Sequence, residues 1–340
     1  MSNPKRKVPA SLSQNPSYQN TFASRTTAFS IHSPLTSQIP ALRQLWKDTF
    51  GDSDAFLDVF HETAFSPERC RCVTISEHVT QNPIKTIIEN KIETAIEDGI
   101  EHAVETAIEK VIAALYWFDC EFQGQPIAYI YAVATDKNYR GQGLCHALME
   151  DTHAHLKKRG YAGAILSPAN ESLFDFYGKM GYQTCAYAAE LEISILNESV
   201  LDDSIYKKEL FIYEKNDLTI RKISKQEFAK LRRRFLPNTA VLQEKENLDF
   251  LEKQADFYAG ENFLLTAQIS DTSSSQPPIL EKYLHGIEFL GDKAVLPYIL
   301  QALGCSNGRF RTIGTEKPLG MYLSFKNIDI LPNYIGFIFD

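Results

Sequence analysis

The sequence predicts an α/β protein of two domains, and three observations lead to that prediction. Apolar residues make up 44% of the 340 residues, enough for a substantial core, and the length fits two domains of roughly 100–200 residues each. Between residues 126 and 195, segments follow in the order strand, loop, helix, strand, helix, strand. The pattern begins afresh after Leu201. This order indicates helices layered on a mixed sheet.

The first 37 residues are rich in Ser, Asn, Thr, Gln and Pro and contain no acidic residue. Such a composition is typical of a solvated tail, and we interpret the basic triplet Lys5-Arg6-Lys7 within it as solvated too. The first domain, residues 38–200, is expected to begin with two short helices and a strand over residues 70–76. The helices are indicated by apolar residues at helical spacing: Leu42, Leu45, Trp46 and Phe50, then Phe56, Val59 and Phe60.

A long amphipathic helix is predicted over residues 84–112, where a β-branched residue recurs at every fourth position. The repeating residues are Ile84, Ile88, Ile92, Ile96, Ile100, Val104, Ile108 and Ile112. One interpretation is a docking face through which copies of the chain form a homo-oligomer, because the apolar face of such a helix must be buried against a partner. The other is packing against the helix's own domain, and the sequence leaves both open.

The remaining elements of the first domain are indicated by local signals. Residues 113–122 and 126–135 are predicted as a hairpin around the turn Gln123-Gly124-Gln125. A helix over residues 144–158 is expected to end at Gly160, which suits a left-handed cap. A strand at 162–166, a helix at 172–180 and strands through 182–195 complete the domain.

The second domain, residues 205–340, shows the same kinds of segment. Strands are predicted over 218–223, 263–269, 283–290, 319–325 and 334–339, helices over 225–235 and 246–258, and a polar loop over 271–278. Arg232, Arg233 and Arg234 are interpreted as a solvated helix face, because neighbouring residues on a helix point in different directions.

Composition argues against several classes of function. A net charge of −8 with interspersed signs gives no sustained basic surface for nucleic acid. No stretch approaches the roughly 20 apolar residues of a membrane span, and the first 30 residues lack a secretory signal pattern, so neither membrane nor secretion is expected. The six cysteines form no CxxC pair, and Cys70 and Cys72 together would supply at most half of a metal site, so we expect no bound metal. The absence of a disulfide or redox pattern favours a cytoplasmic location.

The loop between the second hairpin strand and the helix at 144–158 carries Gly141 and Gly143, with Arg140 before them. Glycine lets a phosphate group approach the main chain, and the following helix N-terminus adds partial positive charge. The loop therefore predicts a pyrophosphate site. It lacks the Lys-Ser/Thr of a nucleoside triphosphate loop and the third glycine of a dinucleotide fingerprint, so another phosphate-bearing ligand is indicated.

Two segments resemble the signatures of the GNAT superfamily of N-acetyltransferases. The first is Val133-Ala134-Thr135 followed, five residues on, by Arg140-Gly141-Gln142-Gly143-Leu144-Cys145, which is similar to the family's Arg/Gln-x-x-Gly-x-Gly/Ala motif. The second, about 30 residues downstream, runs from Asn170 through Phe176-Tyr177 to Gly181-Tyr182 and is similar to the family's Asn…Phe-Tyr-x-x-x-Gly-Phe segment.

The resemblance implies a GNAT fold and a role for each residue. Val133 and Thr135 would pair their main-chain groups with the pantetheine arm of acetyl-CoA, and the amides of residues 140–145 would hold its pyrophosphate. The thioester would lie between the strand ending at Thr135 and the strand at 162–166. Asn170 would touch the cofactor, and Tyr177 beside the thioester sulfur would protonate the leaving thiolate.

Two departures from the family pattern limit this comparison. Cys145 occupies the place of the final Gly or Ala, where it is expected to act as a small packing residue and not as a nucleophile. The strand over residues 127–135 contains no glutamate, so the carboxylate base that some members carry there is absent.

The order of the two halves also resembles tandem GNAT proteins, in which a degenerate second copy follows the active one, as in the enhanced-intracellular-survival acetyltransferases. In that family the terminal carboxylate reaches the active site, which makes Asp340 a candidate base. We therefore expect acetyl transfer from acetyl-CoA to a primary amine of a small molecule or peptide by direct attack. The alternative is a protein that binds CoA as a scaffold or sensor and transfers nothing.

Overall fold

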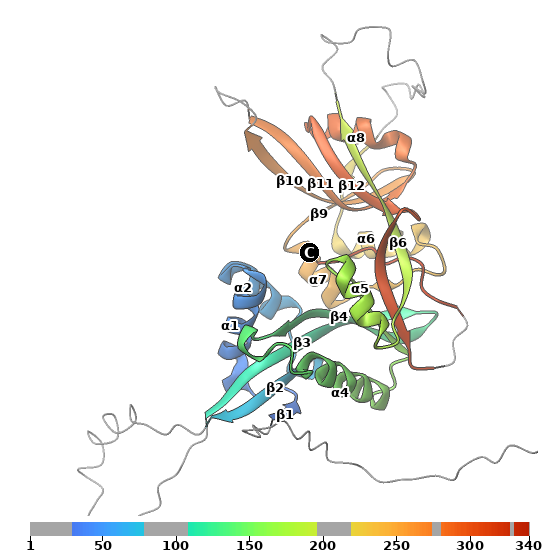
Figure 1. The fold of residues 1–340 in the computed structure, drawn as a ribbon. Coiled ribbons are helices and arrows are strands. Elements are labelled where there is room, and N and C mark those ends of the chain that lie inside the picture. Colours follow the sequence, from blue (N-terminus) through green and yellow to red (C-terminus); the bar gives the residue numbers. More distant parts are fainter. Residues whose placement is uncertain (1–28, 78–107, 196–218, 274–279, 327–329, 340) are drawn as a thin grey trace, which may run out of the picture.

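The computed structural model describes residues 29–77, 108–195, 219–273, 280–326 and 330–339. Within these ranges thirteen strands form one continuous mixed sheet, with helices on both of its faces (Figure 1). The predicted α/β class with a mixed sheet is therefore confirmed. The described helices include none that is long and apolar enough to cross a membrane.

The first half of the chain supplies one wing of the sheet. Its strands, in chain order, are β1 (Phe29–His32), β2 (Cys70–Glu77), β3 (Ile108–Phe122), β4 (Gln125–Thr135), β5 (Gly163–Leu166) and β6 (Gln183–Ser194). Strands β1 to β4 pair antiparallel, and β5 pairs parallel to β4. The predicted hairpin turn is present, with Gln123 and Gly124 both at positive φ.

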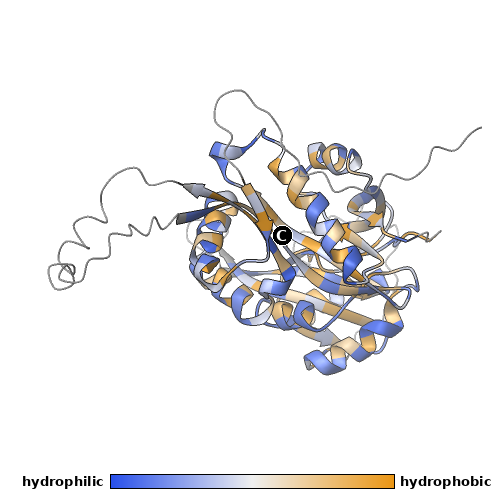
Figure 2. Ribbon diagram, turned by 90° about the horizontal axis from the view of Figure 1, so that it is seen from below, coloured by the Kyte–Doolittle hydropathy of each residue, from blue (hydrophilic) through white to orange (hydrophobic). Residues whose placement is uncertain are grey.

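Four helices cover the two faces of this wing. Helices α1 (Ile39–Phe50) and α2 (Asp54–Thr63) pack on one face, and α4 (Leu144–Lys158) and α5 (Glu171–Gly178) on the other. Side chains alternate along β3 as strand geometry requires: Tyr116 and Phe118 join the cluster of α1 and α2, whereas Leu115 and Trp117 join that of α4 and α5. Hydrophobic residues accordingly follow the strands in Figure 2, while the helices carry hydrophilic residues on their outer sides.

The second half builds the other wing. Its elements are β7 (Arg221–Lys222), α6 (Lys225–Phe235), β8 (Leu242–Gln243), α7 (Glu246–Glu252), β9 (Asp256–Ala259), β10 (Phe263–Ser273), β11 (Leu280–Gly291), α8 (Leu296–Ala302), β12 (Asn307–Ile313) and β13 (Lys317–Ser324). Short 3₁₀ turns lie at Thr36–Gln38, Pro67–Arg69, Lys137–Tyr139 and Lys293–Val295.

The last strand joins the two wings. Strand β13 lies between β5 and β6, antiparallel to both, with Met321 opposite Leu166 and Lys317 opposite Ala188. Beyond β13, strand β6 continues into the second wing and pairs with β12, where Asn307 lies opposite Ser194. Strand β13 of the second half therefore completes the sheet of the first half, and β6 of the first half completes the sheet of the second.

Several predicted elements differ from the structure. Residues 108–112 begin β3 and do not end a helix: Val111 pairs with Thr74 of β2, and β-branched side chains suit that extended position. The rest of the predicted Ile-rich helix, residues 84–107, lies outside the described residues, as do residues 1–28 and the boundary predicted between 201 and 205. The predicted tail is wrong for its last part, because residues 29–32 form β1.

In the second half, the helix predicted over 246–258 ends at Glu252, and the chain turns into β9, which pairs with β10. The strand predicted over 334–339 is also wrong: the segment makes one isolated bridge, between Tyr334 and Ala240. Helix α8 and strand β12 were not predicted. The interpretation of Arg232 as solvated is also wrong, because its side chain is buried and forms an ion pair with Glu288.

Candidate functional site

The predicted cofactor strand, β4, departs from its neighbour where the motif begins. It pairs with β5 from Ile127 to Ile130, opposite Gly163 to Leu166. Within the described residues the two strands do not pair beyond that point. A bulge follows, marked by a positive φ of 48° at Ala132 and by a register shift against β3. Ala134 and Thr135 thus pair with β3 on one side, and residues 133–135 extend beyond the pairing with β5 on the other. Their main-chain groups on that side can face a ligand.

The loop after β4 has the geometry expected of an anion cradle. Gly141 and Gly143 have φ angles of 75° and 77°, are exposed, and have no heavy atom within 4 Å of the position of a Cβ. The Arg140 side chain returns to the strand, where its Nε donates to the Thr135 carbonyl oxygen at 3.0 Å. The loop is therefore open, and its shape depends on glycine at two left-handed positions.

Helix α4 begins directly behind this loop, with Gly143 as its N-cap and no side chain capping its first turn. The first amide groups of a helix lack intrahelical partners and carry partial positive charge. The first turn contains no acidic residue that would repel an anion. These features suit the binding of an anion such as a phosphate group, which is the prediction made for residues 140–145.

Asn170 caps helix α5. Its Oδ1 accepts from the Leu173 amide at 3.3 Å and from the Ser172 hydroxyl at 2.7 Å. Because the oxygen is used in this way, the exposed Nδ2 is the group that remains to donate to a ligand.

Tyr177, on α5, lies in the same hydrophobic cluster as Cys145 of α4 and is 7% exposed. Burial raises the pKa of the Tyr177 hydroxyl well above its usual value, and the nearby Cys145 thiol adds to the shift. Within the described residues no group forms a hydrogen bond with that hydroxyl. The phenol therefore keeps its proton across the physiological range and can donate it.

Cys145 is half-buried, and burial raises the pKa of its thiol to about 11. A thiol with that pKa is almost wholly protonated near neutrality, and the thiolate is the nucleophilic form. Cys145 is thus poorly suited to act as a nucleophile, and it packs between α4 and α5.

The end of the chain comes back to β4. The Phe339 ring lies 4.8 Å from Phe118 and 5.0 Å from Phe250, measured between centroids, and 6.3 and 6.0 Å from Tyr129 and Tyr131 of β4. Asp340, the predicted base, lies outside the described residues. The contact between Phe339 and β4 could not be predicted from the sequence, because about 200 residues separate them.

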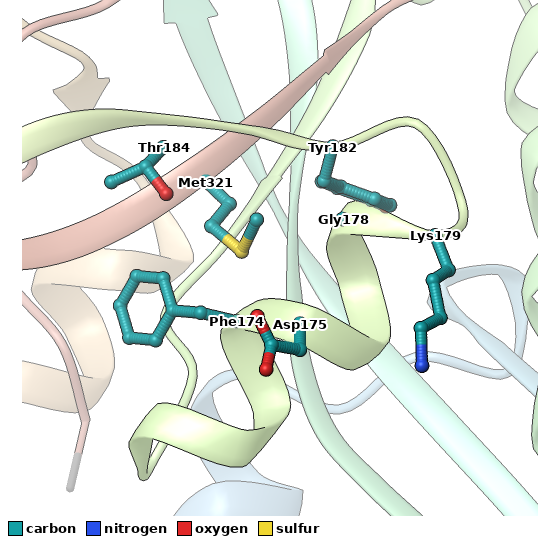
Figure 3. Close-up of a pocket in the computed structure, with 7 residues that line it drawn as sticks. All are labelled: Phe174, Asp175, Gly178, Lys179, Tyr182, Thr184 and Met321. Carbon is teal, nitrogen blue, oxygen red and sulfur yellow. The ribbon is translucent and has the colours of Figure 1, made fainter.

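A separate pocket of about 500 Å³ lies between α5 and the strands β6 and β13. Figure 3 shows Asp175 of α5 and Lys179, which follows that helix, at its edge, with Phe174, Gly178, Tyr182, Thr184 and Met321 as the other lining residues. None of the predicted cofactor residues lines it. Within the described part of the chain, no three His, Cys, Asp or Glu side chains are grouped as they would be around a metal ion.

Comparison with known proteins agrees with this geometry. A family model described as an acetyltransferase (GNAT) domain matches residues 104–185, which include β4, the glycine loop and α5. No curated protein matches the sequence.

Solved structures match over most of the chain. GCN5-related N-acetyltransferases from Kribbella flavida and Anabaena variabilis share 12% and 14% identity, with TM-scores of 0.56 and 0.57. Each comparison covers 87% of this chain, and 71% and 72% of the other chain. Eis1 from Mycobacterium abscessus has a TM-score of 0.52 at 10% identity, over 83% of this chain and 65% of that one.

At these identities the structural matches establish the fold, whereas the matched family model covers the segment that carries the site. Together they support acyl transfer as the general chemistry. Residues 104–185 thus match the GNAT acetyltransferase domain, and the fold of the chain resembles that of GCN5-related N-acetyltransferases and of Eis1.

Proposed function

We propose that this protein transfers acetyl from acetyl-CoA to a primary amine by direct attack. The observation that carries the proposal is the open glycine loop at the N-terminus of α4, which follows the end of β4 and whose Cys145 shares a hydrophobic cluster with Tyr177. Acetyl-CoA supplies the activated acetyl group. The chain's part is to bind it, to orient it, and to move protons.

Binding is assigned to two segments. Val133, Ala134 and Thr135 pair through main-chain groups with the pantetheine arm, beyond the end of the β4 ladder with β5. The amides of residues 140–145 receive the pyrophosphate, and the Nδ2 of Asn170 adds a donor. These contacts hold the thioester near the bulge at Ala132.

Tyr177 is the proposed acid. The leaving thiolate of CoA needs a proton, and a phenol whose pKa is raised by burial stays protonated until it meets a strong base. Its place on α5, in one cluster with the first turn of α4, supports a position beside the sulfur.

Asp340 is the proposed base. An amine must lose a proton to become nucleophilic, and β4 contains no glutamate that could accept it. Support comes from Phe339, the residue bonded to Asp340, whose ring packs against Tyr129 and Tyr131 of β4. Asp340→Asn removes the side-chain carboxylate alone, and deletion of residue 340 removes the whole residue. A wild-type pH–rate profile in both variants would exclude Asp340.

Turnover of acetyl-CoA with a panel of primary amines tests the function itself, with release of the CoA thiol as the signal. Binding of CoA should also increase the free energy of unfolding, by about 2.7 kcal/mol when CoA is at about 100 times its Kd, and so raise the melting temperature. Thiol release that depends on an amine supports transfer. Stabilisation without thiol release from any amine would favour the scaffold or sensor alternative.

The cytoplasm is the proposed location. All six cysteines are free thiols, five of them buried and Cys145 half-buried, which suits a reducing compartment.

A further inference from the structure

The pocket beside α5 is lined by residues other than those assigned to acetyl-CoA, so it is a second site next to the same helix. Its volume of about 500 Å³ lies within the range of about 300–1,000 Å³ that is usual for small-molecule sites. Helix α5 and Lys179, which follows it, form one wall, β6 contributes Thr184, and β13 contributes Met321. The two halves of the chain therefore meet around this space.

The wall formed by α5 is one face of the helix. Phe174 and Gly178 are four residues apart, as are Asp175 and Lys179, and side chains at that spacing lie one above the other. Gly178 keeps this face open, because no described heavy atom lies within 4 Å of the position of its Cβ. Neither a positive φ nor a close contact among the described residues requires glycine here, and glycine is a poor helix former. The space that Gly178 leaves is therefore available to a ligand.

Two opposite charges lie at the edge of the pocket. Asp175 and Lys179 are exposed, and neither side chain forms an ion pair or a hydrogen bond with any residue that the structure describes. They do not pair with each other, although His146 and Glu150 of α4, at the same spacing, approach to 3.4 Å. Each of the two charges is thus available to bind a group of the opposite charge.

The rest of the lining is mainly apolar. Met321 is 3% exposed, and Figure 3 shows its side chain pointing from β13 toward α5, with the Phe174 ring lining the same space. The Tyr182 hydroxyl is paired with His153, so Tyr182 contributes its ring. An aromatic ring and a thioether both make favourable contacts with a second aromatic ring. The pocket therefore combines an apolar surface with one positive and one negative group.

We propose that this pocket binds a free amino acid with a large apolar side chain, preferably an aromatic one. The ligand's carboxylate pairs with Lys179, its ammonium group pairs with Asp175, and its side chain packs on Phe174 and Met321. A ligand with a single charge would leave one of the two charged residues without a partner. The site is separate from the proposed acetyl-transfer site, and its occupation does not depend on the proposed function.

Calorimetric titration with L-phenylalanine, in the absence of CoA, tests the site. A Kd of about 1 mM or below is expected for a ligand of this size. Glycine carries both charges but no apolar side chain, so it should bind at least about tenfold more weakly. Absence of saturable binding of L-phenylalanine would overturn the inference.

Gly178→Leu tests the location, because the new side chain would extend into the pocket. The position is open, so the variant should keep a melting temperature near that of the wild type. Its affinity for L-phenylalanine should fall at least about tenfold. An unchanged affinity would mean that L-phenylalanine binds elsewhere, for example where the amine acceptor binds, and the inference would be wrong.

Two substitutions of exposed residues test the charged contacts separately and do not disturb the core. Lys179→Met should weaken binding of L-phenylalanine and of phenylpropanoate, which has no ammonium group, by about three- to fivefold, because exposed ion pairs contribute that much at most. It should not affect phenethylamine, which has no carboxylate. Asp175→Asn should weaken L-phenylalanine and phenethylamine and leave phenylpropanoate unchanged.

Lys158→Met is the matched control, because it removes an exposed lysine from the end of the neighbouring helix α4. It should change none of the three affinities. If Lys179→Met and Asp175→Asn weaken all three ligands equally, or if neither weakens L-phenylalanine more than Lys158→Met does, the assigned contacts are refuted.

Discussion

Replacing Tyr177 with Phe removes one hydroxyl and keeps the ring that packs α5 on the sheet. The hydroxyl has no hydrogen-bond partner among the described residues, so its loss should change the free energy of unfolding by less than about 1 kcal/mol. Any large effect on turnover would then report chemistry.

The expected effect follows from the proton that Tyr177 is proposed to supply. General acid catalysis contributes about 10²–10⁴-fold, and each factor of ten corresponds to about 1.36 kcal/mol, so the barrier should rise by roughly 3–5 kcal/mol. The Kd of acetyl-CoA should hardly change, because no proposed binding contact uses the hydroxyl. Burial disfavours the phenolate and raises the pKa of Tyr177 well above the usual value of about 10, so wild-type kcat should show no alkaline decline from this group up to about pH 10.

Tyr182→Phe is the matched control. Its hydroxyl lies 2.8 Å from His153 Nε2 in a buried pair, and the two tyrosine rings are neighbours at 5.9 Å. This variant should lose about 1–3 kcal/mol of stability, because it leaves a buried nitrogen unpaired, yet keep kcat near wild type. The assay is single-turnover release of the CoA thiol, with urea unfolding in parallel. If Tyr177→Phe retains kcat within about twofold, the acid assignment is wrong.

Three further changes follow from the structure. Gly143→Ala places a Cβ in the open loop at a φ of 77° and should raise the Kd of acetyl-CoA about tenfold, as measured by calorimetry. Gly124→Ala is the control: at a φ of 69° in the β3–β4 turn it should cause similar backbone strain, roughly 1–2 kcal/mol, without changing that Kd. Equal changes in Kd for the two variants would contradict the assignment of the loop as the anion site. Burial lowers the pKa of His153 from 6.5 to about 4, so the unfolded state binds more protons between these values, and about 3 kcal/mol of stability should be lost as pH falls from 6.5 to 4. Urea titrations at several pH values should show that the free energy of unfolding depends less on pH in His153→Gln than in the wild type. An unchanged pH dependence would argue against a neutral buried imidazole. Glu288→Gln leaves Arg232 buried without its counter-charge and should cost about 3–5 kcal/mol of unfolding free energy, partly recovered by adding Arg232→Met; a loss below about 1 kcal/mol would refute this.

The parts of the site that could be predicted from the sequence are those fixed by local chemistry. Gly141 and Gly143 adopt the left-handed φ angles that their loop requires, Gly160 ends α4 at a φ of 88°, and Asn170 caps α5 through its side chain. Each of these signals acts within a few residues of the chain.

The parts that could not be predicted depend on pairing between distant segments. Nothing in the alternating pattern of β13 indicates that Met321 lies opposite Leu166, about 155 residues away. The same holds for Gln243 and Phe337, whose contact depends on where β8 meets β3. At Ile108 and Ile112 the spacing suited either a helix or a strand, and pairing with β2 decided the outcome.

The exchange of strands between the wings has a consequence for synthesis on the ribosome. Strands β5 and β6 emerge early, yet β13, which separates them, ends at Ser324, about 130 residues after Ser194. At about 5–20 residues per second, roughly 7 to 26 s pass before that strand is available. During this interval the edge of β5 is unpaired, and such edges recruit strands from other chains. A nascent chain stopped before residue 317 should therefore associate with other chains or with chaperones, and the sheet of the first half is completed only once β13 has been synthesised.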